Sequence, residues 1–243
     1  MYGTQLLTVV GLDPNNNIFP IAYAVVERER KESWEWFLNY LKLDLDIDDD
    51  DTCTFMSDKQ NSLIEAFDEV LIYICHRFCV RHLHNNFKRA EYSSISLKNA
   101  LWTAAKATTV KWFDDCMVDI CDLDSEAAEW SKSHFPQTVK CDTLLNNICE
   151  YFNSMIIEAR DKPIITLLEK LRYHLMTSIQ ANRDKCAKWN DNDICPRIKD
   201  VLHKNRASAA EFIPRKSNEG NYEIIGTSIM NNWAVDLLNR KCS

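Results

Sequence analysis

Two carboxylates that lie far apart in the sequence are the residues whose types best suit catalysis. Asp58 follows a short apolar segment, and Glu150 lies in a stretch with helical spacing. Phosphodiester chemistry commonly uses two divalent cations about 4 Å apart, held by acidic side chains from distant segments. Asp58 and Glu150 are therefore candidate metal ligands. On spacing alone they are two of thirty-six acidic residues, and ordinary surface carboxylates remain the alternative.

Other polar side chains accompany these acids. Asn146 and Asn153 lie four positions before and three positions after Glu150, so a helix would present the carboxylate between two amides. Cys79 and His82 are three positions apart, a spacing that could begin a zinc site. The neighbouring cysteines and histidines do not form a convincing second half. A structural or DNA-positioning role for Cys79 and His82 is at least as well supported.

The segments around Asp58 predict alternating strands and helices. Residues 5–10 and 18–26 are apolar and rich in β-formers, and the turn-favouring residues 13–17 between them predict a hairpin. Apolar residues then recur at helical spacing over residues 34–45 and 63–71, on either side of a short strand at 52–56. Residues 72–80 favour another strand. This order is typical of an α/β fold in which Asp58 ends a strand.

Helices are predicted for most of the remaining chain. Residues 97–130 have helical spacing and form a candidate helical insertion. Apolar residues between 144 and 156 mark one face of the helix that carries Glu150. Residues 165–189 and 196–204 predict two more helices, and strand-like segments begin at residue 222.

The net charge of −7 limits any contact with DNA to a local surface, because neutralising phosphates requires clustered Lys and Arg. The alternative for the densest cationic stretch is a solvated helix face. No run of eighteen apolar residues indicates a membrane span, and the ten scattered cysteines favour reduced thiols. The cationic stretch consists of Arg183, Lys185, Lys188, Arg197, Lys199, Lys204 and Arg206.

Four phrases, in their order and spacing, resemble plant Mutator-like element (MULE) transposases. They are QLLTVVGLDPNNNIFPIAYAVVERERKESWEWFL, FMSDKQNSLIEAF, HRFCVRHLHNNFK and CDTLLNNICEYFNSMIIEARDKPIITLLEKLR. The resemblance covers nearly the whole chain. It implies an RNase H-like DDE enzyme that cuts and rejoins DNA with Mg²⁺ or Mn²⁺. It also implies that the DNA partner is the terminal inverted repeats of a mobile element and that the protein is located in the nucleus. A homo-oligomer is left open.

The resemblance also implies roles for individual residues. Asp58 matches the second family Asp in the Ser-Asp-Lys-Gln phrase, and Glu150 matches the family Glu in the Cys-Glu-x-Phe-Asn phrase. These two are the expected catalytic residues and metal ligands. Cys79 and His82 match the family's Cys-x-x-His signature, whose role is not settled by the resemblance. The amides beside Glu150 are expected to support the site.

The chain departs from the family pattern at both ends. An Asp-Gly-x-x-Leu-Lys-Gly phrase normally precedes the Gln5-Leu6-Leu7 phrase, so the first strand and its Asp are expected to be missing. That strand is central in an RNase H-like sheet, and its neighbours would lack a pairing partner. At the C-terminus, Cys242 alone stands where related proteins continue into a SWIM-type zinc finger, so a zinc site is not supported.

These expectations define an RNase H-like mixed sheet formed by residues 1–92 and 141–165. A helical insertion would occupy residues 93–140, and a helical C-terminal extension would occupy 166–243, ending at the start of a truncated SWIM-type zinc finger. The expected function is metal-dependent DNA cleavage and strand transfer, inactive in this chain because one of three acids is absent. The alternatives are a domesticated relative that binds DNA or regulates transcription without catalysis, and a non-functional element fragment.

Overall fold

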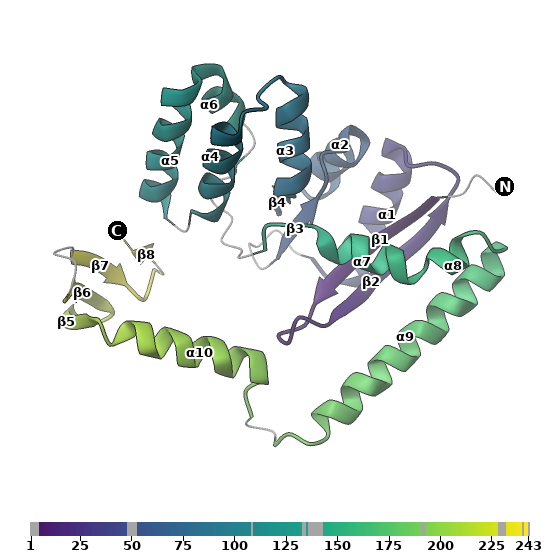
Figure 1. Ribbon diagram of the computed structural model, residues 1–243. Coiled ribbons are helices and arrows are strands. Elements are labelled where there is room, and N and C mark those ends of the chain that lie inside the picture. The colour runs from purple at the N-terminus through teal and green to yellow at the C-terminus, as the bar shows by residue number, and fades with distance from the viewer. Residues whose placement is uncertain are drawn as a thin grey trace. The chain divides into compact units, whose positions relative to one another are not determined.

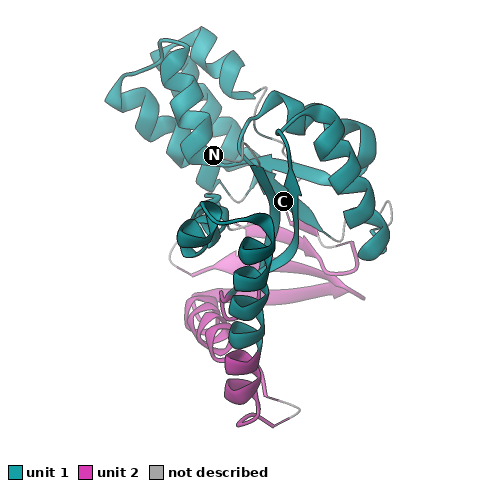
Figure 2. Cartoon of the chain, turned by 90° about the vertical axis from the view of Figure 1, so that its right-hand side faces the viewer, with its two compact units in different colours: residues 1–11, 18–179 teal, residues 12–17, 180–243 magenta. Residues whose placement is uncertain are grey.

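The computed structural model describes residues 5–47, 53–107, 109–132, 135, 143–190, 193–227, 232–239 and 241–242. The chain forms two compact units, one of residues 1–11 and 18–179 and the other of residues 12–17 and 180–243 (Figure 2). Strands and helices alternate in the first half of the larger unit, which confirms the α/β class. The more specific RNase H-like assignment stays a prediction.

The chain begins with the expected hairpin. Strands β1 (Gln5–Leu12) and β2 (Ile18–Val26) pair with each other. Asp13 stabilises the turn between them, because its carboxylate Oδ1 accepts hydrogen bonds from the backbone N–H groups of Asn15 at 2.9 Å and Asn17 at 2.7 Å. Asn16 adopts a positive φ of 62°, a conformation that asparagine tolerates better than most residues.

A parallel strand pair follows the hairpin. Strand β3 (Thr54–Ser57) pairs in parallel with β4 (Cys75–Phe78), and helix α2 (Asn61–Val70) connects them. In the described residues, no strand ladder joins β1–β2 to β3–β4, so the two pairs are separate sheets. Both sheets nevertheless contribute to one hydrophobic core with α2 and helix α1 (Lys31–Asp44). That core includes Leu7, Trp34, Phe37, Leu38, Leu41, Leu63, Phe67 and Leu71.

The hairpin is covered on both faces. Leu7 and Val9 belong to the core beneath α1 and α2, whereas Leu6 and Val10, which alternate with them, face a second cluster. The fully buried Phe152 of helix α7 (Asn147–Met155) is the centre of that cluster. Figure 1 shows α7 lying across the β1–β2 hairpin. The hairpin therefore positions the helix that carries Glu150.

Two elements near the acids are shorter than the sequence predicts. The strand expected over residues 72–80 is confined to β4, because Ile74 closes a turn onto the Leu71 carbonyl and Val80 already begins helix α3 (Val80–Arg89). The helix expected from residue 144 begins only at Asn147, because the Leu144 carbonyl accepts a hydrogen bond from the Val80 N–H. A short helix, α8 (Ile157–Arg160), follows α7.

The expected helical insertion consists of three helices in the part of the chain described. They are α4 (Ile95–Lys106), α5 (Val110–Leu123) and α6 (Ser125–Lys132). The Ser94 and Thr109 side chains accept hydrogen bonds from the first turns of α4 and α5, so the continuous helical pattern is divided by caps. The three helices share a core with Phe87 of α3.

The C-terminal part combines the predicted helices with a sheet that includes the strand-like segments predicted from residue 222. Helices α9 (Ile164–Cys186) and α10 (Pro196–Ala209) form as expected. Strands β5 (Phe212–Asn218), β6 (Asn221–Gly226), β7 (Asn232–Asp236) and β8 (Lys241–Cys242) then form an antiparallel sheet in sequence order. Gly220, with φ of 85°, closes the first hairpin in a conformation that disfavours side chains. No helix among the described residues is long and apolar enough to span a membrane.

Candidate acidic site at the junction of β3, α3 and α7

Asp58 directly follows β3, and a partly buried histidine holds the backbone there. The Ser57 hydroxyl donates to the Asp58 carbonyl at 2.6 Å and lies 2.8 Å from His76 Nε2. Because the hydroxyl donates to that carbonyl, its oxygen accepts the Nε2–H of a neutral imidazole. Burial is the main cause that lowers the pKa of His76 to about 4, and Asp68 opposes this shift. Neutral His76 therefore anchors the end of β3.

Cys79 joins the ends of the two parallel strands. Its backbone N–H donates to the Ser57 carbonyl at 2.8 Å, one residue beyond the last residue of β4. The Cys79 side chain is buried, with 1% of its surface exposed. Helix α3 starts at the next residue, so the Cys-x-x-His segment begins where β3 presents Asp58.

The same cysteine also contacts the start of α7. Its Sγ accepts a hydrogen bond from the Asn146 backbone N–H at 3.2 Å. Next to it, the Val80 N–H donates to the Leu144 carbonyl at 3.0 Å. Two hydrogen bonds thus fix the segment before α7 against the start of α3, although more than sixty residues separate the partners in sequence.

Glu150 lies in the first turn of α7 and pairs with a cation on α3. Arg81 Nη1 donates to Glu150 Oε2 at 3.1 Å, and both side chains are about half exposed. Exposed ion pairs generally contribute less than about 1 kcal/mol to stability. The Arg81–Glu150 pair therefore orients the carboxylate more than it stabilises the fold.

Cys149 precedes Glu150 on α7, and its thiol is electrostatically influenced by both acids. The pKa of the Cys149 thiol is raised to about 11, mainly by burial, and the negative charges of Asp58 and Glu150 contribute smaller shifts in the same direction. A side-chain hydrogen bond from Asn146 acts in the opposite direction. The geometry that relates the segments of Asp58 and Glu150 is the pair of hydrogen bonds that Cys79 forms with Ser57 and with Asn146.

The two amides expected to support Glu150 are placed differently. Asn146 is the N-cap residue of α7, and it contacts Cys149 and Cys79. Asn153 instead uses its side-chain carbonyl to accept a hydrogen bond from Arg160 of α8 at 2.7 Å. Asn146 is thus part of the site, whereas the Asn153 carbonyl oxygen contacts the following helix.

The described residues do not form a complete metal centre. Carboxylate oxygens are suitable ligands for Mg²⁺ or Mn²⁺, but no group of three or more His, Cys, Asp or Glu side chains in the described ranges could hold an ion. His82 Nδ1 is buried without a hydrogen-bond partner in this part of the structure. Cys242 lies exposed on β8 with a free thiol. Neither a complete magnesium site nor a zinc site follows from these residues.

Several contributors to the site were not identified from the sequence. Ser57 lies in the Ser-Asp-Lys-Gln phrase and Arg81 lies between Cys79 and His82, but neither pattern assigned these residues a role, and no pattern marks His76. The backbone N–H of Asn146 gives no sequence signal at all, because every residue except proline has one. Their roles follow from tertiary contacts.

Comparison with known proteins identifies the N-terminal part of the chain. The family model of the MULE transposase domain matches residues 1–86, a range that includes Asp58, Cys79 and His82 and excludes Glu150. A search of the curated proteins found no match. Over residues 1–86 the chain is therefore similar to the MULE transposase domain.

Proposed function

We propose that this chain is a transposase-derived core that binds DNA, and that Asp58 and Glu150 are the carboxylates that would hold Mg²⁺ or Mn²⁺ at its DNA-cleavage site. The observation that carries the proposal is the junction of β3, α3 and α7, where Cys79 is hydrogen-bonded both to Ser57, the residue before Asp58, and to Asn146, four residues before Glu150. The family match supports a role for Asp58. For Glu150, which lies outside the matched residues, the support is its position beside the matched segment.

We further propose that the chain by itself has little or no DNA-cleaving activity. DDE enzymes, which the sequence resembles, use three acids, and two carboxylates bind and position divalent ions less well. DNA binding without cleavage would suit a domesticated transposase relative that regulates transcription, and action on chromosomal DNA would place the protein in the nucleus.

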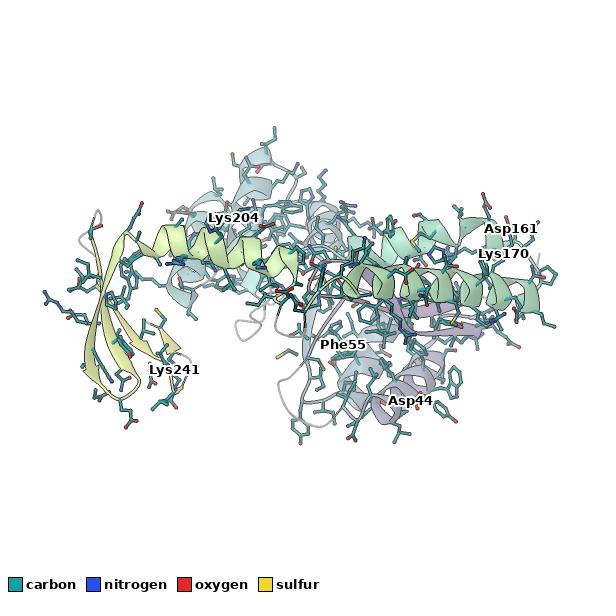
Figure 3. The ribbon with its side chains drawn as sticks, turned by 90° about the horizontal axis from the view of Figure 1, so that it is seen from below. Asp44, Phe55, Asp161, Lys170, Lys204 and Lys241 are labelled. Atoms are coloured by element: carbon teal, nitrogen blue, oxygen red, sulfur yellow. The ribbon has the colours of Figure 1, made fainter. Side chains whose placement is uncertain are left out.

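The C-terminal part of the chain is the proposed DNA-binding surface. Residues 180–243 contain eleven Lys and Arg against eight Asp and Glu, whereas the chain as a whole is acidic. Helix α10 buries none of its residues, and its exposed cations include Lys199, Lys204 and Arg206; Figure 3 labels Lys204 on this helix. Clustered exposed cations are what contact with DNA phosphates requires.

Fluorescence anisotropy with a labelled DNA duplex tests the binding proposal. The wild-type chain should bind the duplex at low salt. Replacing Lys199 and Arg206, which lie seven positions apart on one helix face, by Ala should weaken binding by about tenfold. Lys170→Ala, which removes an exposed cation from α9, is the matched control and should bind like the wild type. Absence of binding at low salt would contradict the proposal.

Incubation with terminal-repeat DNA and Mn²⁺ tests the proposed lack of cleavage. The expected result is intact DNA with both the wild type and Asp58→Ala. Robust cleavage that Asp58→Ala abolishes would overturn the lack of activity while supporting the assignment of the site. Cleavage that persists in both Asp58→Ala and Glu150→Ala would contradict the assignment of the two acids.

A further inference from the structure

Cys79 contacts both of the segments that carry the proposed site. We propose that Cys79 is a positioning residue, whose backbone and thiol join the end of β3, with Asp58, to the start of α7, with Glu150. The importance of this connection for catalysis rests on the proposed function. It assigns a structural task to the cysteine of the Cys-x-x-His segment.

The hydrogen bonds of Cys79 form a short path between the two acids. On one side, the Cys79 N–H donates to the carbonyl of Ser57, the residue before Asp58. On the other side, Cys79 Sγ accepts the backbone N–H of Asn146, four residues before Glu150. Both segments are thereby fixed to a single residue. A displacement of Cys79 would move both carboxylates.

Burial makes this connection difficult to replace. Only 1% of the Cys79 surface is exposed, so water has little access to the thiol side of the contact. An N–H group that loses its acceptor in a partly buried position has to find another partner or remain unsatisfied. Without the sulfur, one of the two hydrogen bonds described between this segment and the start of α3 is lost, and the bond between the Val80 N–H and the Leu144 carbonyl remains.

The geometry favours positioning over zinc binding for this cysteine. A zinc-bound cysteine is a thiolate that shares the ion with three further ligands in a structural site. Cys79 Sγ instead accepts a backbone N–H, and His82 is the one other zinc-binding residue type in the Cys79–His82 motif. No group of three or more potential ligands occurs in the ranges that the structure describes. The cysteine therefore acts through Asn146 and Ser57.

Hydrogen–deuterium exchange of the full chain tests the inference with two substitutions at one position. Cys79→Val fills the space but lacks a hydrogen-bond acceptor, whereas Cys79→Ser keeps an acceptor. Cys79→Val should accelerate exchange at residues 143–150 by about tenfold, and Cys79→Ser should restore slow exchange. Cys116→Val is the matched control, because Cys116 is equally buried but lies on α5. It should leave exchange at residues 143–150 unchanged.

Three results would overturn the inference. The first is equal exchange at residues 143–150 in the wild type, Cys79→Val and Cys79→Ser. The second is a sulfur-to-metal absorption band on adding Co²⁺ that disappears in Cys79→Ser, since that band would make Cys79 a metal ligand. The third applies if Cys79→Val accelerates exchange throughout the chain, in which case Cys79→Ser becomes the deciding variant. Faster exchange at residues 143–150 in Cys79→Ser than in the wild type would then contradict the inference. None of these measurements uses DNA, so their failure is distinct from a failure of the proposed function.

Discussion

Arg81 and Glu150 are 69 positions apart in the sequence, yet their side chains form an ion pair with a nitrogen–oxygen distance of 3.1 Å. Arg81 lies on α3, between Cys79 and His82, and Glu150 lies in the first turn of α7. The pair therefore connects the matched MULE segment with a helix beyond it.

Arg81→Ala should leave the stability of the fold nearly unchanged. Both partners are about half exposed, and pairs of this kind contribute less than about 1 kcal/mol. Urea denaturation followed by circular dichroism measures the free energy of unfolding. Arg172→Ala, which removes the exposed pair with Glu169 on α9, is the matched control and should have a similarly small effect. A loss several times larger for Arg81→Ala alone would show that the pair supports the fold.

Phe152→Ala should destabilise the larger unit strongly. Phe152 is fully buried between α7 and the hairpin, in contact with the cluster that contains Leu6, Val10 and Leu171. Removing a buried phenyl ring costs about 3–5 kcal/mol. Tyr151→Ala, at the exposed neighbouring position on the same helix, should change stability by less than about 0.5 kcal/mol. Equal effects of the two substitutions in urea denaturation would mean that α7 does not pack on the hairpin.

Stability should fall as the pH drops below the ordinary pKa of histidine, 6.5, because of His76. Burial keeps the folded pKa of His76 at about 4, so between these two values the unfolded chain binds the proton more readily. The stability that the folded state gains from keeping His76 neutral is therefore fully present above pH 6.5, and it is lost as the pH falls towards 4. From about pH 7 to 5, the wild type should lose about 2 kcal/mol more than His76→Gln.

Urea denaturation of both proteins at the two pH values measures this difference. His203→Gln on the exposed face of α10 is the control, and it should lose as much stability as the wild type. If His76→Gln and the wild type respond equally to pH, His76 is not held neutral against Ser57.

The salt dependence of DNA binding should identify which cations contact phosphates. Each phosphate contact contributes about 0.9 to the slope of log affinity against log salt concentration. Removing Lys199 and Arg206 should therefore lower that slope by up to about 2, whereas Lys170→Ala should leave it unchanged. Anisotropy titrations at several salt concentrations give the slopes. A weaker affinity with an unaltered slope would mean that α10 affects binding indirectly.

Local sequence patterns predicted the elements whose structure depends on local properties. The hairpin of β1 and β2 follows from two apolar segments around a turn at Asp13, and α1 follows from apolar residues at helical spacing. The position of Asp58 after β3 was predicted in the same way. The late start of α7 was not, because it depends on a hydrogen bond between Val80 and Leu144.

Other features depend on partners that the sequence does not indicate. Strand-like segments were predicted from residue 222, where β6 and β7 lie. Strand β5 was missed, because it is exposed along its whole length and has no alternating pattern of buried residues. The choice of Asp58 and Glu150 among thirty-six acids came from family resemblance, not from spacing. The link through Cys79 involves the Asn146 backbone, which carries no residue-specific signal.

Paramagnetic broadening by Mn²⁺ in amide NMR spectra tests most directly whether Asp58 and Glu150 belong to one site. The account predicts that the amide signals of residues around Asp58 and around Glu150 broaden together over the same range of Mn²⁺ concentration. Asp58→Asn should reduce the broadening in both segments. Broadening that is confined to one segment, or that responds independently to Asp58→Asn and Glu150→Gln, would contradict a shared site.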